Sequence, residues 1–491
     1  MSSKATFDRE EARYVDLVAL GVRRIVGLCG PDAAAWSGLG LLLSVSALLF
    51  FFDFGARVLA SNDEARFPVL AQDILARGDW LLPRLNGTPH LNKPPLSAWL
   101  IALASWPGGQ VTQSTAALPS LLAALGVVVL TSWTARRLFG AETALVAGLI
   151  VVTTYGVFDL ARVPMPDIAL CLAVTAAMAA FVATEFGHHR RALIVAYALV
   201  GVASLTKGPV ALLGLVVMTT YTLSVDGPPG LRRLASPTGL LLLGLLVVPW
   251  WLLGAASDRG GAMRDVAVND WFGWYLPHGG WRWRAVMDPF AQTATVLLPW
   301  APLVPAALWS ALRAGDPMRG RRVRLPVIWA GVVFILIALS HQQRMRYYLP
   351  LCPPVALLIA AWYSRITLPH KERVGAAVWL LAALGLGLWQ AHAGPRYNAA
   401  TDLRAIVSLT QARTKPLYAV EVPELVFTFS LKQPVVLLSD LRQFEALVDE
   451  GRDGYLVIAD RVLPASSAAS RVQRLGGGRV NGRAFSILAP L

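Results

Sequence analysis

The sequence predicts an all-α polytopic membrane protein with juxtamembrane amphipathic helices and a small C-terminal α/β domain. Of its 491 residues, 55% are hydrophobic and only 15% are charged, and the mean hydropathy is +0.53. Soluble chains average about 25% charged residues, so this composition indicates that lipid surrounds most of the chain. Moreover, about eleven apolar stretches are long enough for a hydrocarbon core of about 30 Å, which predicts about eleven transmembrane helices. After residue 392 the pattern changes to short β-rich strings.

The predicted spans begin behind a polar leader and are joined mostly by short loops. They lie near residues 36–56, 115–135, 141–160, 166–185, 192–206, 208–224, 238–256, 290–311, 325–340, 347–364 and 374–392. The first follows about 35 polar and charged residues, which is too long a lead for an ordinary cleaved signal peptide. We therefore expect the first span to be retained.

Arginine clusters in the loops orient the chain. They occur at Arg136-Arg137, Arg190-Arg191, Arg232-Arg233, Arg319–Arg324 and Arg365–Arg373. Positively charged loops stay on the cytoplasmic side, so the net charge of +14 indicates orientation in a membrane rather than nucleic-acid binding. This predicts a membrane protein with a cytoplasmic N-terminus. The loops 57–114 and 257–287 and the C-terminal domain are then on the outer side.

The tail predicts a second domain. Its β-rich strings "KPLYAVEV", "PVVLLS", "YLVIAD" and "AFSILAP" alternate with helix-like pieces such as "LRQFEALVDEG". Strands that alternate with helices are typical of a small α/β domain. We therefore divide the chain into a transmembrane domain, residues 1–392, and an α/β domain outside the membrane, residues 393–491.

The loop after the first span contains two short helical patterns. Apolar residues recur at helical spacing in 67–78, which predicts an amphipathic helix lying in the membrane interface. Ser61 and Glu64 form the pattern of a capping box, and Asp63 and Arg66 share a helix face. A second short interfacial helix is expected in 91–106, after Pro94-Pro95.

Four charged residues of this loop are candidates for chemistry. Asp63 and Glu64 are carboxylates that can accept a proton or orient an amine or phosphate. Arg66 and Lys93 are phosphate-binding cations. The structural alternatives are that the acids complement the helix dipole and that the cations reach toward lipid headgroups.

Later loops supply a second group of candidates. Asp167 opens a span after Pro166, so it is either a second site carboxylate or a helix-start acid. Lys207 lies at a Gly-Pro break, where it suits either a phosphate contact or an interface anchor. The last candidates lie on the outer side and are Arg344, Arg346 and Tyr347. Arginines are usually enriched on the cytoplasmic side, so two of them here indicate either an anionic ligand or anchoring to lipid headgroups.

These residues stand in motifs that resemble a known family. The stretch "DEARFPVLAQDILARGDWLLPRLNGTPHLNKPPLSAWL" is similar to the first outer loop of integral-membrane glycosyltransferases of the GT-C superfamily. It resembles the loops of bacterial aminoarabinose (lipid A) transferases and protein O-mannosyltransferases. The pieces "ARVPMPD", "SLTKGPVALL" and "SHQQRMRYYLPLCPPVALL" support the likeness, which covers most of residues 36–365.

The resemblance implies a glycosyltransferase that moves a sugar from a polyprenyl (undecaprenyl) phosphate carrier to an envelope acceptor by inverting displacement at the periplasmic face. It also implies that the chain lies in the bacterial inner membrane, with its outer loops and α/β domain in the periplasm. Lipid A or another glycolipid is the first-choice acceptor, and Ser or Thr hydroxyls of a protein are the alternative. Asp63, Glu64 and Asp167 match the acidic site residues. Arg66 and Lys93 match the residues that hold the carrier phosphate, and Lys207 and the region of Arg346 and Tyr347 match the donor cavity.

The need for a metal stays open. Asn92 stands where aminoarabinose transferases usually carry a glutamate that is associated with a bound metal, and His278, in the aromatic loop 269–284, is a lone candidate ligand. A divalent metal is therefore possible, but no cofactor is certain. The three cysteines have neither disulfide nor metal spacing.

A function from another class is a transporter or flippase of a lipid-linked substrate. Transporters place ionisable residues and broken helices near the bilayer midplane, often in repeated halves. This sequence shows no repeat, and its candidate site residues gather at one surface. The pattern therefore favours the transferase.

Overall fold

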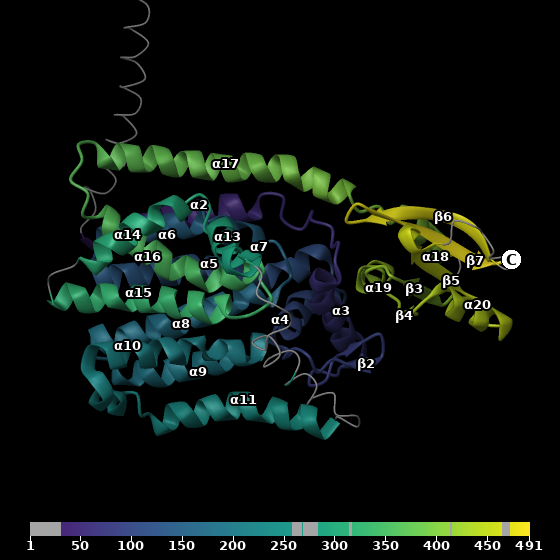
Figure 1. The fold of residues 1–491 in the computed structure, drawn as a ribbon, viewed down its shortest axis with the longest axis horizontal. Coiled ribbons are helices and arrows are strands. Elements are labelled where there is room, and N and C mark those ends of the chain that lie inside the picture. The colour runs from purple at the N-terminus through teal and green to yellow at the C-terminus, as the bar shows by residue number, and fades with distance from the viewer. Residues whose placement is uncertain (1–30, 258–267, 269–282, 314–316, 413–414, 464–471) are drawn as a thin grey trace, which may run out of the picture.

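The computed structural model describes residues 31–257, 268, 283–313, 317–412, 415–463 and 472–491. Most of these residues form a bundle of helices, and a sheet lies beyond one end of the bundle (Figure 1). The α-helices are α2 (Pro31–Phe51), α3 (Asn62–Arg77), α4 (Leu96–Ser105), α5 (Gln113–Phe139), α6 (Ala141–Val152), α7 (Tyr155–Leu160), α8 (Pro166–Gly187), α9 (Arg190–Lys207), α10 (Leu213–Gly230), α11 (Pro237–Ser257), α13 (Trp283–Val296), α14 (Val304–Leu312), α15 (Pro317–Ala338), α16 (Cys352–Tyr363), α17 (Lys371–Ala399), α18 (Arg404–Ala412), α19 (Glu424–Leu431) and α20 (Leu441–Asp449).

The bundle is that of a multi-pass membrane protein, as predicted. Within the described ranges, five helices are long and apolar enough to cross a membrane, or six if the bent pair α13 and α14 is one span. One of the five is the stretch Arg190–Arg233, which contains both α9 and α10 and so combines two predicted spans. Shorter apolar helices occur in α2, α4 and α6. The total of about eleven spans remains a prediction.

Charged residues of the described chain form clusters at both ends of the bundle. At the end away from the sheet, Asp226 pairs with both Arg233 and Arg321. Arg233 also lies 3.8 Å from Glu185, which is near the C-terminal end of α8. Asp167 is at the other end of that helix. Since α8 has 22 residues, about 30 Å separates its two ends at 1.5 Å per residue.

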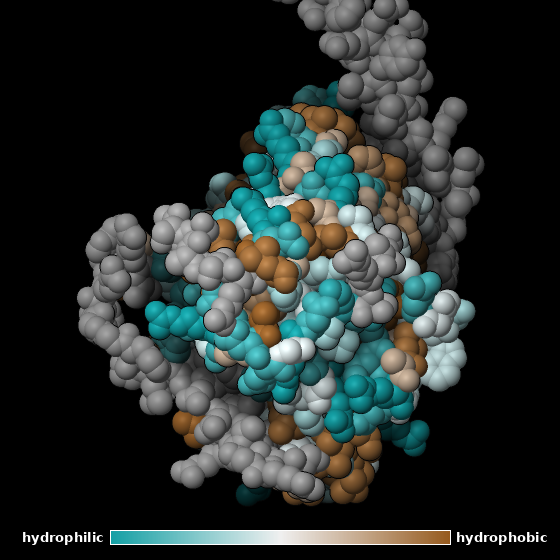
Figure 2. Space-filling model, turned by 90° about the vertical axis from the view of Figure 1, so that its right-hand side faces the viewer, coloured by the Kyte–Doolittle hydropathy of each residue, from teal (hydrophilic) through white to brown (hydrophobic). Residues whose placement is uncertain are grey.

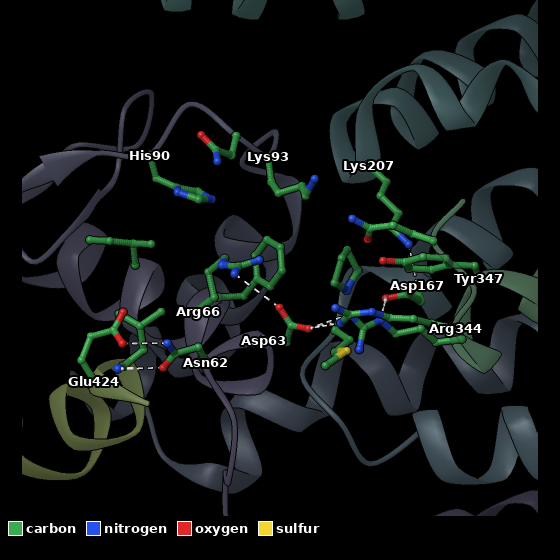
Figure 3. Close-up of a pocket in the computed structure, with 18 residues that line it drawn as sticks. Asn62, Asp63, Arg66, His90, Lys93, Asp167, Lys207, Arg344, Tyr347 and Glu424 are labelled. Carbon is green, nitrogen blue, oxygen red and sulfur yellow. Dashed lines mark hydrogen bonds and ion pairs between the residues drawn. The ribbon is translucent and has the colours of Figure 1, made fainter. Parts of the chain in front are cut away.

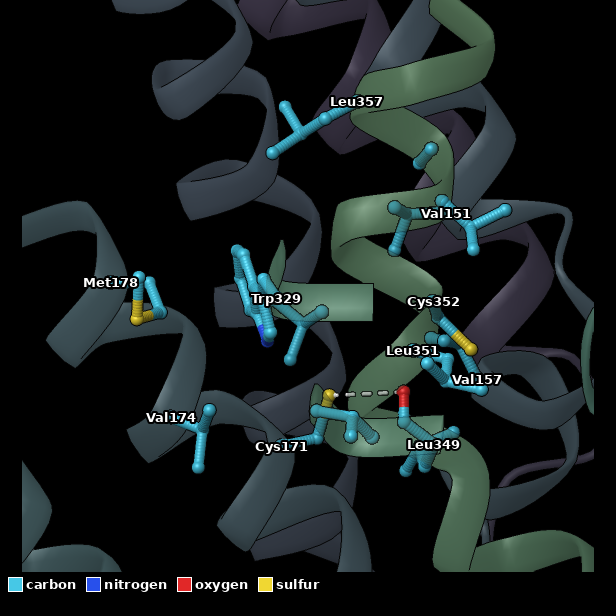
Figure 4. Packing of buried hydrophobic residues seen from close by; sticks show 14 of the residues in the cluster. Val151, Val157, Cys171, Val174, Met178, Trp329, Leu349, Leu351, Cys352 and Leu357 are labelled. Carbon is cyan, nitrogen blue, oxygen red and sulfur yellow. Dashed lines mark hydrogen bonds between the residues drawn. The ribbon is translucent and has the colours of Figure 1, made fainter. Parts of the chain in front are cut away.

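The core of the bundle fixes the short helix that later contributes to the site. Trp329, Met178 and Leu357, from α15, α8 and α16, pack together in this core (Figure 4). The thiol of Cys171 on α8 donates a weak hydrogen bond to the carbonyl of Leu349 at 3.5 Å. This contact attaches the 3-10 helix η7 (Met345–Leu351), which leads directly into α16, to α8.

The first loop folds largely as predicted. α3 begins at Asn62, and the side chain of its N-cap, Ser61, accepts a hydrogen bond from the Glu64 amide. The other half of the expected capping box was wrong. In a capping box the Glu64 carboxylate would accept a hydrogen bond from the Ser61 amide, but here it accepts from the Ala60 amide. α4 lies inside the predicted range 91–106. Between them, β1 (Arg84–Leu85) and β2 (Thr88–Pro89) form a hairpin whose two-residue Asn86-Gly87 turn has positive φ at both positions.

The tail contains the small sheet that was predicted. Its strands are β3 (Leu417–Val420), β4 (Val435–Leu437), β5 (Tyr455–Ala459), β6 (Val472–Val480) and β7 (Arg483–Pro490). They lie in the order β4-β3-β5-β7-β6, with β3 parallel to β4 and β5, and β7 antiparallel to β5 and β6. The sequence did not predict β6, because Gly476–Gly478 is typical of a loop. Close packing explains two of these glycines, since a Cβ would lie 2.5 Å from the Phe485 carbonyl oxygen at Gly477 and 2.3 Å from the Asp402 carbonyl oxygen at Gly478.

The sheet and the first loop share one hydrophobic core. Leu70 and Ile74 of α3 belong to the same buried cluster as Phe427 of α19 and Ile487 of β7. α19 lies beside α3 in Figure 1, and the two helices pack against each other. Seen from the sheet end, the surface is mostly hydrophilic, with hydrophobic patches above and below (Figure 2). The tail therefore covers the polar end of the bundle and is packed against it.

Candidate functional site

A cavity of about 350 Å³ lies where β1 and six other segments meet at the sheet end of the bundle. The start of α3, the segment after β2, the start of α8, the end of α9, η7 with its preceding residues, and the start of α19 all contribute to its wall (Figure 3). It brings together eight of the ten predicted site residues, which are Asp63, Arg66, Lys93, Asp167, Lys207, Arg344, Arg346 and Tyr347. Charges from remote parts of the chain thus converge in one hollow.

Asp63 is surrounded by three arginines. Its Oδ2 accepts hydrogen bonds from Arg344 Nη1 at 2.6 Å and from Arg346 Nη2 at 2.7 Å. Its Oδ1 lies 3.3 Å from Arg66 Nη2, the neighbour predicted from the helix spacing. Burial raises the pKa of the Asp63 carboxyl, but the hydrogen bonds and charges of these arginines outweigh burial and lower that pKa to about 2. In this state Asp63 is a carboxylate and a weak base.

The lowered pKa of Asp63 predicts how the stability of the protein depends on pH. An ordinary aspartate has a pKa of about 3.9, so the ion pairs of Asp63 stabilise the fold fully above pH about 4 and are lost as the pH falls towards 2. We expect Asp63→Asn to lower the melting temperature by a constant amount between pH about 5 and about 8, and by less below pH about 4. Thermal unfolding of the full chain in detergent measures this difference. A difference that shrinks between pH about 5 and about 7 contradicts the predicted direction.

Asp167 forms a second, more deeply buried ion pair. Its Oδ1 accepts from Lys207 Nζ at 2.6 Å, and its Oδ2 lies 3.9 Å from Arg346 Nε. The side chains of Asp167 and Lys207 are only 3% and 9% exposed. Lys207 Nζ also lies 4.1 Å from the ring centroid of Tyr347, so a cation–π contact supports the pair. Arg346 bridges the two carboxylates, Asp63 and Asp167.

The break at Gly208 places Lys207 in the cavity wall. Lys207 is the last residue of α9, and Gly208 has φ of 69° and ψ of −140°, a conformation that favours glycine. The chain then turns through the short 3-10 helix η2 (Gly208–Leu212) into α10. The Gly-Pro motif seen in the sequence therefore ends a helix at the point where its final side chain meets Asp167.

His90 and Lys93 approach the cavity from the segment after β2. His90 was not predicted as a site residue, although it lies only three positions before Lys93. Burial, together with the charges of Arg66 and Lys93, lowers the pKa of the His90 imidazole to about 3. The ring is therefore neutral, and its buried Nε2 has no hydrogen-bond partner in the described part of the chain.

Glu64 points away from the cavity and holds the segment that precedes α3. Its carboxylate accepts from Arg57 Nη2 at 3.0 Å, from the Tyr397 hydroxyl at 2.9 and 3.0 Å, and from the Ala60 amide at 2.9 Å. Arg57 also donates to Asp159 on α7 at 3.1 Å. This network joins the start of α3 to α7 and α17, so Glu64 does not line the cavity with the other predicted acids.

The described side chains do not fit a divalent metal. No group of three or more His, Cys, Asp or Glu residues among them is arranged to hold one. The oxygens of Asp63 and Asp167 already face arginine and lysine nitrogens. His278 lies outside the described residues. Cys171 and Cys352 are buried free thiols in the apolar core.

The cavity also contains residues that the sequence did not reveal. Besides His90, these include Asn62 and Glu424, the first residues of α3 and α19. Asn62 could have been predicted as a site residue, because it is adjacent to Asp63 in the sequence. Glu424 could not, because it lies more than 300 positions after Asp63 and only the packing of the tail brings it to the cavity.

Comparison with known proteins relates this geometry to sugar-transferring enzymes. A family described as dolichyl-phosphate-mannose-protein mannosyltransferase matches residues 92–252, which include Lys93, Asp167 and Lys207. An undecaprenyl phosphate-alpha-4-amino-4-deoxy-L-arabinose arabinosyl transferase of Pectobacterium carotovorum is 27% identical over 384 residues, which is 72% of this chain and 66% of the relative. Its counterpart in Edwardsiella ictaluri is 28% identical over 383 residues, 72% of this chain and 64% of the relative. The matches thus span just under two thirds of these relatives.

Among solved structures, ArnT from Cupriavidus metallidurans bound to undecaprenyl phosphate superposes with a TM-score of 0.78. The superposition covers 91% of this chain and 97% of that chain, at 20% identity. The fold is that of ArnT. The oligosaccharyltransferase of Archaeoglobus fulgidus is more distant, with a TM-score of 0.54 at 11% identity, over 87% of this chain and 69% of its own. Together with ArnT and the sequence relatives, it confirms the predicted resemblance to the GT-C superfamily.

Proposed function

We propose that the chain is a glycosyltransferase that moves a sugar from undecaprenyl phosphate to lipid A or another glycolipid of the cell envelope. The observation that supports this most directly is the cavity itself, which five cationic side chains and three carboxylates line at one end of an ArnT-like bundle. The named relatives act on an undecaprenyl phosphate-linked aminoarabinose, which points to the same class of donor for this chain.

The cations form the donor phosphate site. Arg66, Lys93, Lys207, Arg344 and Arg346 all line the cavity. Guanidinium groups bind phosphate oxygens through paired hydrogen bonds, and a lysine adds a point charge. In the displacement, the bond from the anomeric carbon to the phosphate oxygen breaks, and negative charge grows on the departing undecaprenyl phosphate. Cations fixed around that oxygen stabilise the transition state.

Asp63 directs the acceptor. A bound phosphate competes with Asp63 for Arg344 and Arg346, whose hydrogen bonds hold the carboxyl pKa low. Donor binding therefore frees the carboxylate and makes it a better base. It then accepts the proton of the acceptor hydroxyl while the acceptor oxygen bonds to the anomeric carbon with inversion. Asp167 holds Lys207 and Arg346 in place, and Glu64 is a positioning residue for the start of α3.

We place the cavity at the periplasmic face of the bacterial inner membrane, with the N-terminus cytoplasmic and the tail as a periplasmic domain. The arginine cluster around Asp226 supports this orientation, because it lies at the end of α8 remote from the cavity. Positive clusters mark the cytoplasmic side. We keep the proposed division into residues 1–392 and 393–491, and α17, which connects the two parts, runs on to Ala399.

A protein acceptor and a transport function are the two alternatives. The matching family description favours a protein hydroxyl as the second candidate acceptor. A lipid-linked substrate transporter fits less well, because the charged cavity is at one end of the bundle instead of at its middle.

The function is tested with the full chain in proteoliposomes that contain the undecaprenyl phosphate-linked aminosugar. We expect mass spectrometry to show lipid A heavier by one sugar and the release of undecaprenyl phosphate. A Ser/Thr-containing peptide serves as the competing acceptor. Movement of the donor between leaflets without a new glycosidic bond would support the transporter and contradict the transferase.

A further inference from the structure

The small domain contributes one carboxylate to the cavity, that of Glu424. This residue begins α19, which packs against α3. The side-chain amide of Asn62 donates to Glu424 Oε2 at 2.7 Å, and its oxygen accepts from the Leu425 amide at 3.1 Å. Asn62, which immediately precedes Asp63, thus holds Glu424 at the edge of the cavity (Figure 3).

Glu424 differs from the other two cavity carboxylates in its charge balance. Asp63 and Asp167 are each neutralised by surrounding arginine or lysine side chains. In the described part of the chain, Glu424 forms no ion pair, and its hydrogen bond from Asn62 brings no charge. A half-buried carboxylate is costly to keep without a cation. A position in the first turn of α19 favours an acid through the helix dipole, but this effect does not require the side chain to line the cavity.

The cavity is polarised across its width. In Figure 3, Lys207, Arg344 and Tyr347 lie on one side and Glu424 lies on the other, with Arg66 and Lys93 between them. The charges of Arg66 and Lys93 act on His90, so Glu424 is the group of this side that suits a cation. The side of Lys207 and Arg344 suits a phosphate. The side of Glu424 repels a phosphate and attracts a group that is positively charged and donates hydrogen bonds.

We propose that Glu424 binds a primary ammonium group and thereby determines which substrate the enzyme accepts. This inference rests on the proposed transfer reaction, because it assigns the phosphate to the opposite side of the same cavity. The ammonium can belong to the carried sugar or to the acceptor. The tail is then part of the binding site, through a residue that contacts the substrate.

The test measures binding to the full chain in proteoliposomes. Glu424→Gln removes the charge but keeps an oxygen that can accept from Asn62, so the contact with α3 is preserved. The matched control is Glu421→Gln, an exposed position three residues earlier that pairs with Arg461 and does not line the cavity. The donor arm displaces radiolabelled undecaprenyl phosphate with undecaprenyl phosphate-linked 4-amino-4-deoxy-L-arabinose, or with the same lipid carrying L-arabinose. The acceptor arm titrates the undecaprenyl phosphate-loaded protein with octyl glucosaminide or octyl glucoside.

We expect the wild-type chain and Glu421→Gln to prefer the amine over the hydroxyl about tenfold in one of the two arms. That arm identifies whether the sugar or the acceptor carries the ammonium. Glu424→Gln loses this preference and binds undecaprenyl phosphate itself as tightly as the wild type, which also shows that the variant is folded.

Two results overturn the inference while leaving the proposed function intact. They are a wild-type chain that binds undecaprenyl phosphate but shows no preference for an amine in either arm, and a Glu424→Gln variant that keeps the preference. A wild-type chain that does not bind undecaprenyl phosphate contradicts the proposed function, and the inference falls with it.

Discussion

Asp63→Asn is expected to lower sugar transfer by about 10³-fold, because the variant has no carboxylate to accept the proton of the acceptor. The amide keeps the shape of the side chain and remains at the centre of the three arginines. Binding of undecaprenyl phosphate should be as tight as in the wild type, or tighter. The reason is that Arg344 and Arg346 no longer have to leave an anionic partner when the phosphate arrives.

The measurements are single-turnover transfer and equilibrium binding, both in proteoliposomes. Asp73→Asn is the matched control, since Asp73 is on the same helix and pairs with Arg77 away from the cavity. It should leave both quantities close to the wild-type values. Transfer by Asp63→Asn at the wild-type rate would show that Asp63 is not the base. Loss of carrier binding together with transfer would show that its role is to hold the arginines.

Lys207→Met should have the largest effect on stability. It removes the main partner of Asp167, which is 3% exposed, and breaking a buried pair in this way costs about 3–5 kcal/mol. Arg346 Nε lies 3.9 Å from Asp167, so it offsets part of that cost. We therefore expect the lower end of the range, together with loss of transfer, because a cation of the phosphate site is missing.

A double variant separates the two consequences of Lys207→Met. Adding Asp167→Asn removes the unpaired buried charge, so thermal unfolding in detergent should recover most of the lost stability while transfer stays absent. Lys415→Met, which breaks an exposed pair with Asp453, is the control and should cost less than about 1 kcal/mol. If the double variant were as unstable as Lys207→Met alone, unpaired charge would not be the cause.

The local parts of the fold and site could be predicted from the sequence. The pair Asp63–Arg66 follows from helical spacing, and Lys207 follows from the Gly-Pro break that ends its helix. The convergence of these residues with Arg346 followed only from the family resemblance, since nothing in the spacing brings a residue some 280 positions away onto Asp63.

Other features depended on tertiary contacts that a sequence pattern does not contain. The sequence around Glu64 fits a capping box, but in the structure its carboxylate accepts hydrogen bonds from Arg57 and Tyr397. The glycines of β6 suggest a loop, yet the close approach of Asp402 favours glycine at Gly478 within the strand. Glu424 reaches the cavity only because α19 packs on α3.

The hydrophobic core shared by α3 and the sheet has a consequence for how the chain folds. Leu70 and Ile74 belong to the same buried cluster as Phe427 and Ile487, although several hundred positions of chain lie between the two pairs. The core beneath the helix that presents Asp63 is therefore complete only when β7 has docked. A substitution that loosens the sheet, far from the cavity in sequence, should thus reduce transfer as well as stability.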